Sequence, residues 1–184
     1  MEIIQEYKKQ KLVPFGEFLP FENVLSRIGL KKITEGHGSF LSGKKQDNLK
    51  FDKVNILPLI CYEIIFTDLV QSSSKDTNLI INISEDGWFG NSVGPQQHFV
   101  HSIYRAIESG KYVLRSSNNG ISAIVNPLGE IEKKVYLNQS DFIDFSESKK
   151  IKSTIFSQYG NKIFGLIILL YIFLIFSFNK FKNE

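Results

Sequence analysis

The single cysteine of the chain, Cys61, stands directly after a stretch with the pattern of a buried strand. Residues 54–60, VNILPLI, are mostly aliphatic and predict this strand, although Pro58 weakens the expected pairing. A cysteine at a strand-to-helix turn can be a nucleophile, because the turn exposes its side chain and nearby backbone N–H groups can bind an oxyanion. An inert, buried cysteine is the alternative. Catalysis by Cys61 therefore requires partners from elsewhere in the chain.

A thiolate that attacks a carbonyl needs a base to take its proton and a cation that favours S⁻. Histidine is one source of the base, but His98 and His101 lie on a helix predicted after the second strand, and spacing alone brings neither to Cys61. The other source is a carboxylate, with lysine as the cation. Residues 7–17, YKKQKLVPFGE, carry three lysines and Glu17 in or beside a Pro/Gly loop. A solvated charged face is the alternative for this segment.

Hydrophobic periodicity predicts the elements that must position these groups. Strands are expected over 54–60, 79–83, 112–116, 121–125 and 130–136, and helices over 64–71 and 94–109. The Pro and Gly residues within 12–25 predict an ordered loop there. Residues 31–52 are polar and predict a loop with at most one short strand. Strands that alternate with helices and close in a hairpin favour an α/β layered domain.

Composition limits the classes of site. A chain of 184 residues that is 42% hydrophobic fits one globular domain with a real core. One cysteine excludes an intramolecular disulfide, and His37, His98 and His101 lack zinc-ligand spacing, so we expect neither a metal nor another cofactor. The net charge of +3 is modest and forms no basic stripe, which argues against a nucleic-acid partner.

The C-terminal residues 163–178, IFGLIILLYIFLIFSF, are apolar and uncharged. With polar flanks this stretch approaches the roughly 20 residues of a membrane span, so we predict a transmembrane helix over 163–179. A buried core helix is the alternative. The N-terminus has neither a basic region nor an apolar stretch, so no signal peptide is expected.

Four segments in order, from about residue 7 to residue 129, resemble one known family. They are YKKQKLVPFGEFLP, ICYEIIF, NISEDGWFGNSVGPQQH and RAIESGKYVLRSSNNGISAIVNPLGE. Together they resemble the nitrilase (carbon–nitrogen hydrolase) superfamily and, within it, the bacterial apolipoprotein N-acyltransferases. The resemblance implies the C-terminal portion of a nitrilase-like αββα sandwich over 1–150, a linker over 151–162, the transmembrane helix over 163–179 and a cytoplasmic tail over 180–184.

The resemblance also implies a Glu–Lys–Cys triad. Lys9 matches the lysine because it stands two residues after Tyr7 of the family's lysine motif. Its ammonium would favour the Cys61 thiolate and, with the backbone N–H of Tyr62, stabilise an oxyanion. Glu17 matches a second glutamate that the family needs near the site, and it could orient Lys9. The candidate catalytic residues are therefore Cys61, Lys9 and Glu17, and the candidate substrate-binding residues are Tyr62, Glu63 and Trp88.

Other residues keep two interpretations. Trp88 either contacts substrate or only packs its loop. Arg105 and Arg115 are expected to form internal ion pairs or hydrogen bonds. A group of apolar side chains beside the lysine motif either fills the core or forms a rim where lipid acyl chains enter; its members are Phe15, Phe18, Leu19 and Phe21.

The chain departs from the family in one respect. The family's general-base glutamate lies far upstream of the lysine motif, and neither Glu2 nor Glu6 matches it. The family's membrane bundle and half of its sandwich have no match either. We therefore expect the C-terminal part of such an enzyme, either from a truncated or split reading frame or as a piece that works with a separate N-terminal half.

The function implied by the resemblance is transfer of an acyl chain from a membrane phospholipid, through a thioester on Cys61, to the α-amine of an apolipoprotein's diacylglyceryl-cysteine. An amidase or nitrilase that hydrolyses small C–N substrates is one alternative, and an inactive membrane-anchored fragment is another. The expected location is the bacterial cytoplasmic (inner) membrane, with the catalytic domain on its outer, periplasmic face.

Overall fold

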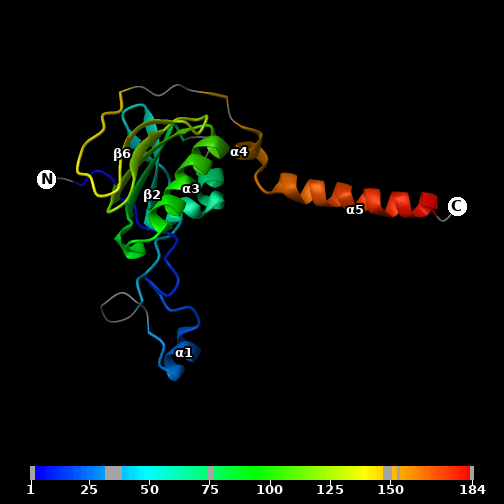
Figure 1. Ribbon diagram of the computed structural model, residues 1–184, viewed down its shortest axis with the longest axis horizontal. Helices are drawn as coiled ribbons and strands as arrows, with labels where there is room; N and C mark the ends of the chain where they lie inside the picture. The colour runs from blue at the N-terminus through cyan, green and yellow to red at the C-terminus, as the bar shows by residue number, and fades with distance from the viewer. Residues whose placement is uncertain (1–2, 32–38, 74–76, 147–150, 153, 183–184) are drawn as a thin grey trace.

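The computed structural model describes residues 3–31, 39–73, 77–146, 151–152 and 154–182. Six strands of these residues form one sheet in the order β1-β2-β3-β4-β5-β6 (Figure 1). The central strands β2, β3 and β4 are parallel, and the other neighbouring pairs are antiparallel. The strands are β1 (Leu49–Phe51), β2 (Val54–Ile60), β3 (Leu79–Glu85), β4 (Tyr112–Asn118), β5 (Ser122–Val125) and β6 (Ile131–Val135).

Helices cover one face of this sheet. The helices α2 (Thr67–Ser73) and α3 (Gly94–Ser109) contribute apolar side chains to the main core, whose buried residues alternate along β2, β3 and β4 as a pleated strand requires. Short turns follow the strands at η2 (Cys61–Ile65) and η3 (Gly87–Phe89). The core residues are Leu57, Leu59, Ile64, Leu69, Val70, Ile80, Phe99, Ala106, Val113, Ala123 and Val125.

The opposite face of the sheet is only partly covered by the described residues. Ile143 and Phe145 pack against a small cluster formed by Leu79, Tyr112 and Ile124. Ile83, on the central strand β3, is 61% exposed. This face therefore presents apolar side chains that the described part of the chain does not bury.

Four further elements lie outside the sheet and its two covering helices. The helix α1 (Glu22–Leu25) and the turn η1 (Ser26–Ile28) sit at the tip of an excursion below the domain (Figure 1). The helix α4 (Ile155–Tyr159) packs against α2 and α3 and leads into α5 (Lys162–Lys182), which extends outward from the domain.

The predicted α/β class is confirmed, and the bounds of β2 and α3 agree with the sequence prediction. The strands β3 and β4 extend beyond their predicted ends, and α2 begins at Thr67 because residues 61–65 form the turn η2 first. Pro58 is tolerated since β1 pairs only with residues 54–56, so at Pro58 the strand pairs with β3 alone.

The transmembrane helix predicted over 163–179 is not supported. Helix α5 forms there, but no helix among the described residues combines the length and the apolar character that a membrane crossing requires.

Candidate active site

Cys61 occupies a sharp turn at the end of β2. Its backbone has φ of +54°, a left-handed conformation that costs a non-glycine residue about 1 kcal/mol. This conformation ends the strand and begins η2, which leaves the half-buried thiol at the carboxyl edge of the sheet. The Cys61 Sγ lies 3.9 Å from the backbone carbonyl oxygen of Glu85, at the end of the parallel neighbour β3. The parallel pairing of β2 and β3 therefore brings the two strand ends together.

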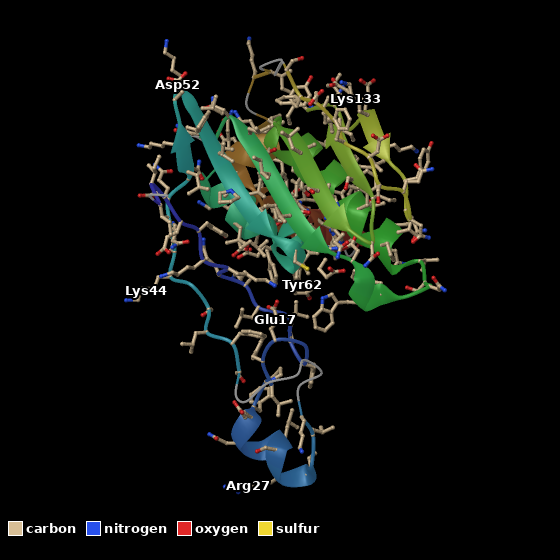
Figure 2. The ribbon with its side chains drawn as sticks, turned by 90° about the vertical axis from the view of Figure 1, so that its left-hand side faces the viewer. Glu17, Arg27, Lys44, Asp52, Tyr62 and Lys133 are labelled. Atoms are coloured by element: carbon tan, nitrogen blue, oxygen red, sulfur yellow. The ribbon has the colours of Figure 1, made fainter. Side chains whose placement is uncertain are left out.

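A cavity of about 260 Å³ opens beside Cys61. In Figure 2, Tyr62 and Glu17 lie at one edge of the sheet, between the strand ends and the excursion that carries Arg27. The residues that follow β3 close another side of the cavity. Its lining consists of Val13, Pro14, Gly16, Glu17, Cys61, Tyr62, Glu85, Trp88, Phe89 and His98.

Lys9 and Glu17 form a close ion pair. The Lys9 Nζ lies 2.6 Å from Glu17 Oε1, and the two side chains are only 12% and 20% exposed. The second carboxylate oxygen of Glu17 accepts a hydrogen bond from the backbone N–H of Val13 (3.0 Å). The orientation of Lys9 by Glu17 that the sequence suggested is thus present. Glu17 lines the cavity, whereas Lys9 contacts Glu17 and is not part of the lining.

Glu63 is fully buried and binds backbone rather than the cavity. Its carboxylate accepts hydrogen bonds from the backbone N–H groups of Gln10 (2.6 Å), Lys11 (3.1 Å) and Ile60 (2.8 Å). The Tyr7 hydroxyl donates to it as well, at 3.1 Å and 3.2 Å. Burial, together with the charge of Glu63, raises the pKa of Tyr7 above its usual value. Glu63 thereby joins the lysine segment to the last residue of β2.

A buried polar network underlies the opposite wall of the cavity. The Asp86 Oδ2 pairs with Arg115 Nη2 at 2.7 Å, and Asp86 Oδ1 lies 2.8 Å from His98 Nδ1. Arg115 also donates to Asn82, whose amide donates to the carbonyl oxygens of Leu59 (3.0 Å) and Cys61 (3.4 Å). The network therefore connects α3 and β4 to the backbone of the Cys61 turn.

Burial and neighbouring charges have opposite effects on the pKa values of Asp86 and Arg115 in this network. Burial raises the pKa of Asp86, but the hydrogen bond from His98 and the Arg115 charge lower it to about 2 overall. Burial lowers the pKa of Arg115, and the charges of Asp86 and Cys61 oppose that shift. The expected internal pairing of Arg115 is present, and so is that of Arg105, whose guanidinium pairs with Glu108 at 3.0 Å.

The structure brings four of the six predicted site residues to one cavity and leaves the other two, Lys9 and Glu63, outside its lining. Glu17, Cys61, Tyr62 and Trp88 line one cavity, and Trp88 is 56% exposed. Glu63 lies outside this lining, and the substrate-binding role assigned to it remains a prediction.

His98 is a cavity residue that spacing along the sequence did not place near Cys61. The signal was the GPQQH string: Gly94 and Pro95 begin α3, so His98, the fifth helical residue, lies close to the N-terminal end of the helix, and it lines the cavity together with Cys61 and Glu85. Within the described residues, no cluster of three His, Cys, Asp or Glu side chains is arranged to hold a metal ion. His37 and Glu2 lie outside the described residues.

Sequence comparison identifies similar proteins across nearly the whole chain. The carbon-nitrogen hydrolase family matches residues 1–142. An apolipoprotein N-acyltransferase of Rickettsia bellii is 46% identical over 184 residues, covering 97% of this chain and 35% of that protein. The apolipoprotein N-acyltransferase of Rhodopseudomonas palustris is 37% identical over 174 residues, covering 94% of this chain and 32% of that protein. The chain thus spans about a third of the length of these relatives.

Structural comparison supports the same fold. An amidase of the nitrilase superfamily from Nesterenkonia AN1 superposes with a TM-score of 0.51 at 17% sequence identity. The match covers 74% of this chain and 48% of the amidase, so the sheet and its helices have a nitrilase-type arrangement.

Proposed function

The chain belongs to the carbon–nitrogen hydrolase family, and we propose that it forms the thioester-bearing part of an apolipoprotein N-acyltransferase. In the first step the Cys61 thiolate attacks an ester carbonyl of a phospholipid. A C–S bond forms, the ester C–O bond breaks, and the lysophospholipid leaves with a proton. In the second step the α-amine of a lipid-modified N-terminal cysteine attacks the thioester. A C–N bond forms, the C–S bond breaks, and the amine loses a proton.

The observation that carries this proposal is the Cys61 turn beside the Lys9–Glu17 ion pair. A left-handed turn at the end of a parallel strand presents the thiol to a cavity that Glu17 also lines. Glu17 holds the Lys9 ammonium at 2.6 Å, in a setting that is shielded from solvent and so strengthens its electrostatic effect. A fixed cation near a thiol favours the thiolate, which is the reactive form. Similarity to the N-acyltransferases of Rickettsia bellii and Rhodopseudomonas palustris suggests the two substrates.

An apolar groove next to the cavity is our proposed path for the acyl chain. It encloses about 590 Å³ and shares Pro14 with the Cys61 cavity. Phe18, Leu19, Phe40 and Phe66 are among its lining residues. Of the rim suggested from the sequence, Phe18 and Leu19 lie in this groove, while Phe21 is 82% exposed.

The uncovered face of the sheet is the proposed position of a complementary N-terminal half. The curated relatives are about three times as long as this chain, and Ile83 is 61% exposed at the centre of the sheet. A second apolar sheet could bury this face, as in other layered α/β domains. The triad glutamate that acts as general base would belong to that half.

Helix α5 is the proposed point of contact with the membrane. Its apolar side chains are exposed: Phe164, Leu166, Leu169, Tyr171, Phe173 and Phe176 each have more than half of their surface accessible. Exposed apolar surface on this scale indicates an interaction with lipid or protein. We place the catalytic domain on the outer face of the cytoplasmic membrane, where lipid-modified lipoproteins would reach it.

The test is the intact mass of the chain after incubation with phosphatidylglycerol vesicles. We expect an added acyl group that hydroxylamine removes, since hydroxylamine cleaves thioesters. Cys61→Ser is the matched control and should carry no hydroxylamine-labile adduct.

A second arm repeats the experiment with the upstream two-thirds of a curated relative co-expressed. An adduct only in this arm assigns the base to the separate half. No adduct on Cys61 in either arm contradicts the proposal and favours an inactive fragment.

A further inference from the structure

His98 is held in one orientation at the wall of the Cys61 cavity. Its side chain is 4% exposed and its ring lines the cavity. The Phe89 ring packs beside it, with the ring centroids 5.6 Å apart. Nδ1 is fixed by Asp86 Oδ1 at 2.8 Å, which prevents the ring from flipping without loss of a buried hydrogen bond.

The other ring nitrogen, Nε2, is buried and has no hydrogen-bond partner among the described residues. A buried polar atom without a partner costs about 1–3 kcal/mol, and the ring that carries Nε2 lines the cavity, so a ligand group that displaces the neighbouring side chains enough to reach Nε2 would be stabilised there. The two carboxylates that line the cavity, by contrast, both have hydrogen-bond partners. Glu17 accepts from Lys9 and from Val13, and Glu85 accepts from Gly87 N–H and the Asn118 amide.

The partners of Nδ1 determine which kind of group Nε2 can bind. Asp86 is ionised, because Arg115 and His98 hold its pKa near 2. Arg115 Nη2 also lies 3.2 Å from Nδ1, but the ionised carboxylate is closer, at 2.8 Å, and would repel the lone pair of an unprotonated Nδ1. Because an ionised carboxylate only accepts hydrogen bonds, Nδ1 carries the proton and donates it to Asp86. In the neutral ring, Nε2 is then the unprotonated nitrogen and an acceptor. The group that completes it must therefore bring an N–H or O–H.

We propose that His98 Nε2 accepts a hydrogen bond from the amine nucleophile and orients it toward the acyl group on Cys61. The inference rests on the proposed function, and it identifies a residue for the second step alone. The reacting ester of a phospholipid has only acceptor oxygens and cannot satisfy Nε2, whereas a primary amine offers N–H donors. With one N–H bound to Nε2, the amine lone pair is left free to attack the thioester carbonyl carbon.

Two substitutions at this position separate a ligand-binding role from a structural one. In His98→Asn the amide nitrogen can replace Nδ1 as the donor to Asp86, but nothing replaces Nε2. In His98→Gln the longer side chain can place an amide oxygen near Nε2, but the donor to Asp86 is lost. The matched control is His101→Asn, one turn further along α3 and outside the cavity lining.

The measurement loads the acyl group chemically, so it does not depend on phospholipid. The full chain is acylated on Cys61 with p-nitrophenyl hexanoate, and loss of the acyl group is followed by intact mass at increasing glycinamide concentrations. We expect His98→Asn to lower the amine-dependent rate of acyl loss about tenfold, which corresponds to the loss of one hydrogen bond to a reacting group. The rate of hydrolysis without amine should change little. His98→Gln should retain most of the rate, and His101→Asn should match wild type.

The opposite ranking, with His98→Asn near wild type and His98→Gln strongly impaired, would assign His98 a purely structural role and overturn the proposal. Equal rates in all variants would overturn it as well. If His98→Asn fails to fold, the test relies on His98→Gln. A rate of acyl loss that still saturates with glycinamide concentration in this variant supports the proposal, and loss of that saturation contradicts it. Vesicles that fail to acylate wild-type Cys61 both with and without the upstream half contradict the phospholipid donor, while a His98-dependent aminolysis of the loaded thioester still supports the amine contact.

Discussion

At the scale of single residues, Glu63 has a more definite structural role than its place beside the nucleophile indicated. The carboxylate is fully buried and accepts hydrogen bonds from three backbone N–H groups and from Tyr7. Two of these donors, Gln10 and Lys11, directly follow Lys9. Glu63 consequently fixes the backbone from which Lys9 reaches Glu17, and it links that segment to the strand that carries Cys61.

We expect Glu63→Gln to lower the free energy of unfolding by about 2 kcal/mol, because hydrogen bonds to a charged acceptor become bonds to a neutral amide and one amide hydrogen faces a donor. Urea denaturation measures this change. The same variant should slow alkylation of Cys61 by iodoacetamide, since Lys9 is no longer held in place.

Glu6→Gln is the matched control. Glu6 forms an exposed ion pair with Lys8, so its loss should change neither quantity appreciably. Wild-type stability in Glu63→Gln would contradict the role described for the buried carboxylate.

At the scale of elements, the sequence predicted most of the strands well, because β2 and β3 contain aliphatic runs and because Gly, Pro or Asn residues separate β3, β4, β5 and β6. It also predicted that Cys61 follows a strand. It could not place His98, since the distance between a helix residue and a strand end depends on how α3 packs on the sheet. The lysine motif was located only through the family resemblance, because its lysines alone do not distinguish Lys9, whose ion pair is largely buried, from Lys8, whose ion pair is exposed.

The Asp86 network, which ties β3, β4 and α3 together, predicts a pH dependence of stability. The folded pKa of Asp86 is about 2, below its ordinary value of 3.8, so the unfolded chain binds the proton more readily. Asp86 therefore contributes stability above about pH 4, on the order of 2 kcal/mol, and this contribution is lost as pH falls toward 2. Urea unfolding between pH 2 and pH 6 should show a shallower acid decline in Asp86→Asn than in wild type.

Asp47→Asn serves as the control for this experiment, because Asp47 is an exposed carboxylate outside the network. Its acid decline should parallel that of wild type. Parallel declines in Asp86→Asn and wild type would contradict the assignment of the acid sensitivity to Asp86.

At the scale of the whole molecule, the chain combines a compact α/β layer with two surfaces that it does not bury, the open sheet face and α5. Both are apolar where solvent would reach them. For α5 we expect binding to lipid vesicles, which flotation through a density gradient detects. Leu169→Lys together with Ile172→Lys should move the chain out of the vesicle fraction, because each lysine places a charge on the apolar surface that would contact lipid.

Asn161→Lys adds a charge just before α5 and should leave flotation unchanged, which separates an effect of apolar contact from one of net charge. Retained flotation in the double lysine variant would show that another surface holds the chain on vesicles.

The Glu63 contacts also bear on how the protein is made. The Gln10 N–H and its acceptor on Glu63 are 53 residues apart in the chain, so a ribosome must add all the intervening residues before they can meet. Closing a loop of that length carries an entropic penalty that grows with the logarithm of its size and is offset only once β2 is in place. A growing polypeptide thus contains Cys61 before the backbone that carries Lys9 is fixed. The proposed active site is therefore completed only after Glu63 has been synthesised and β2 is in place.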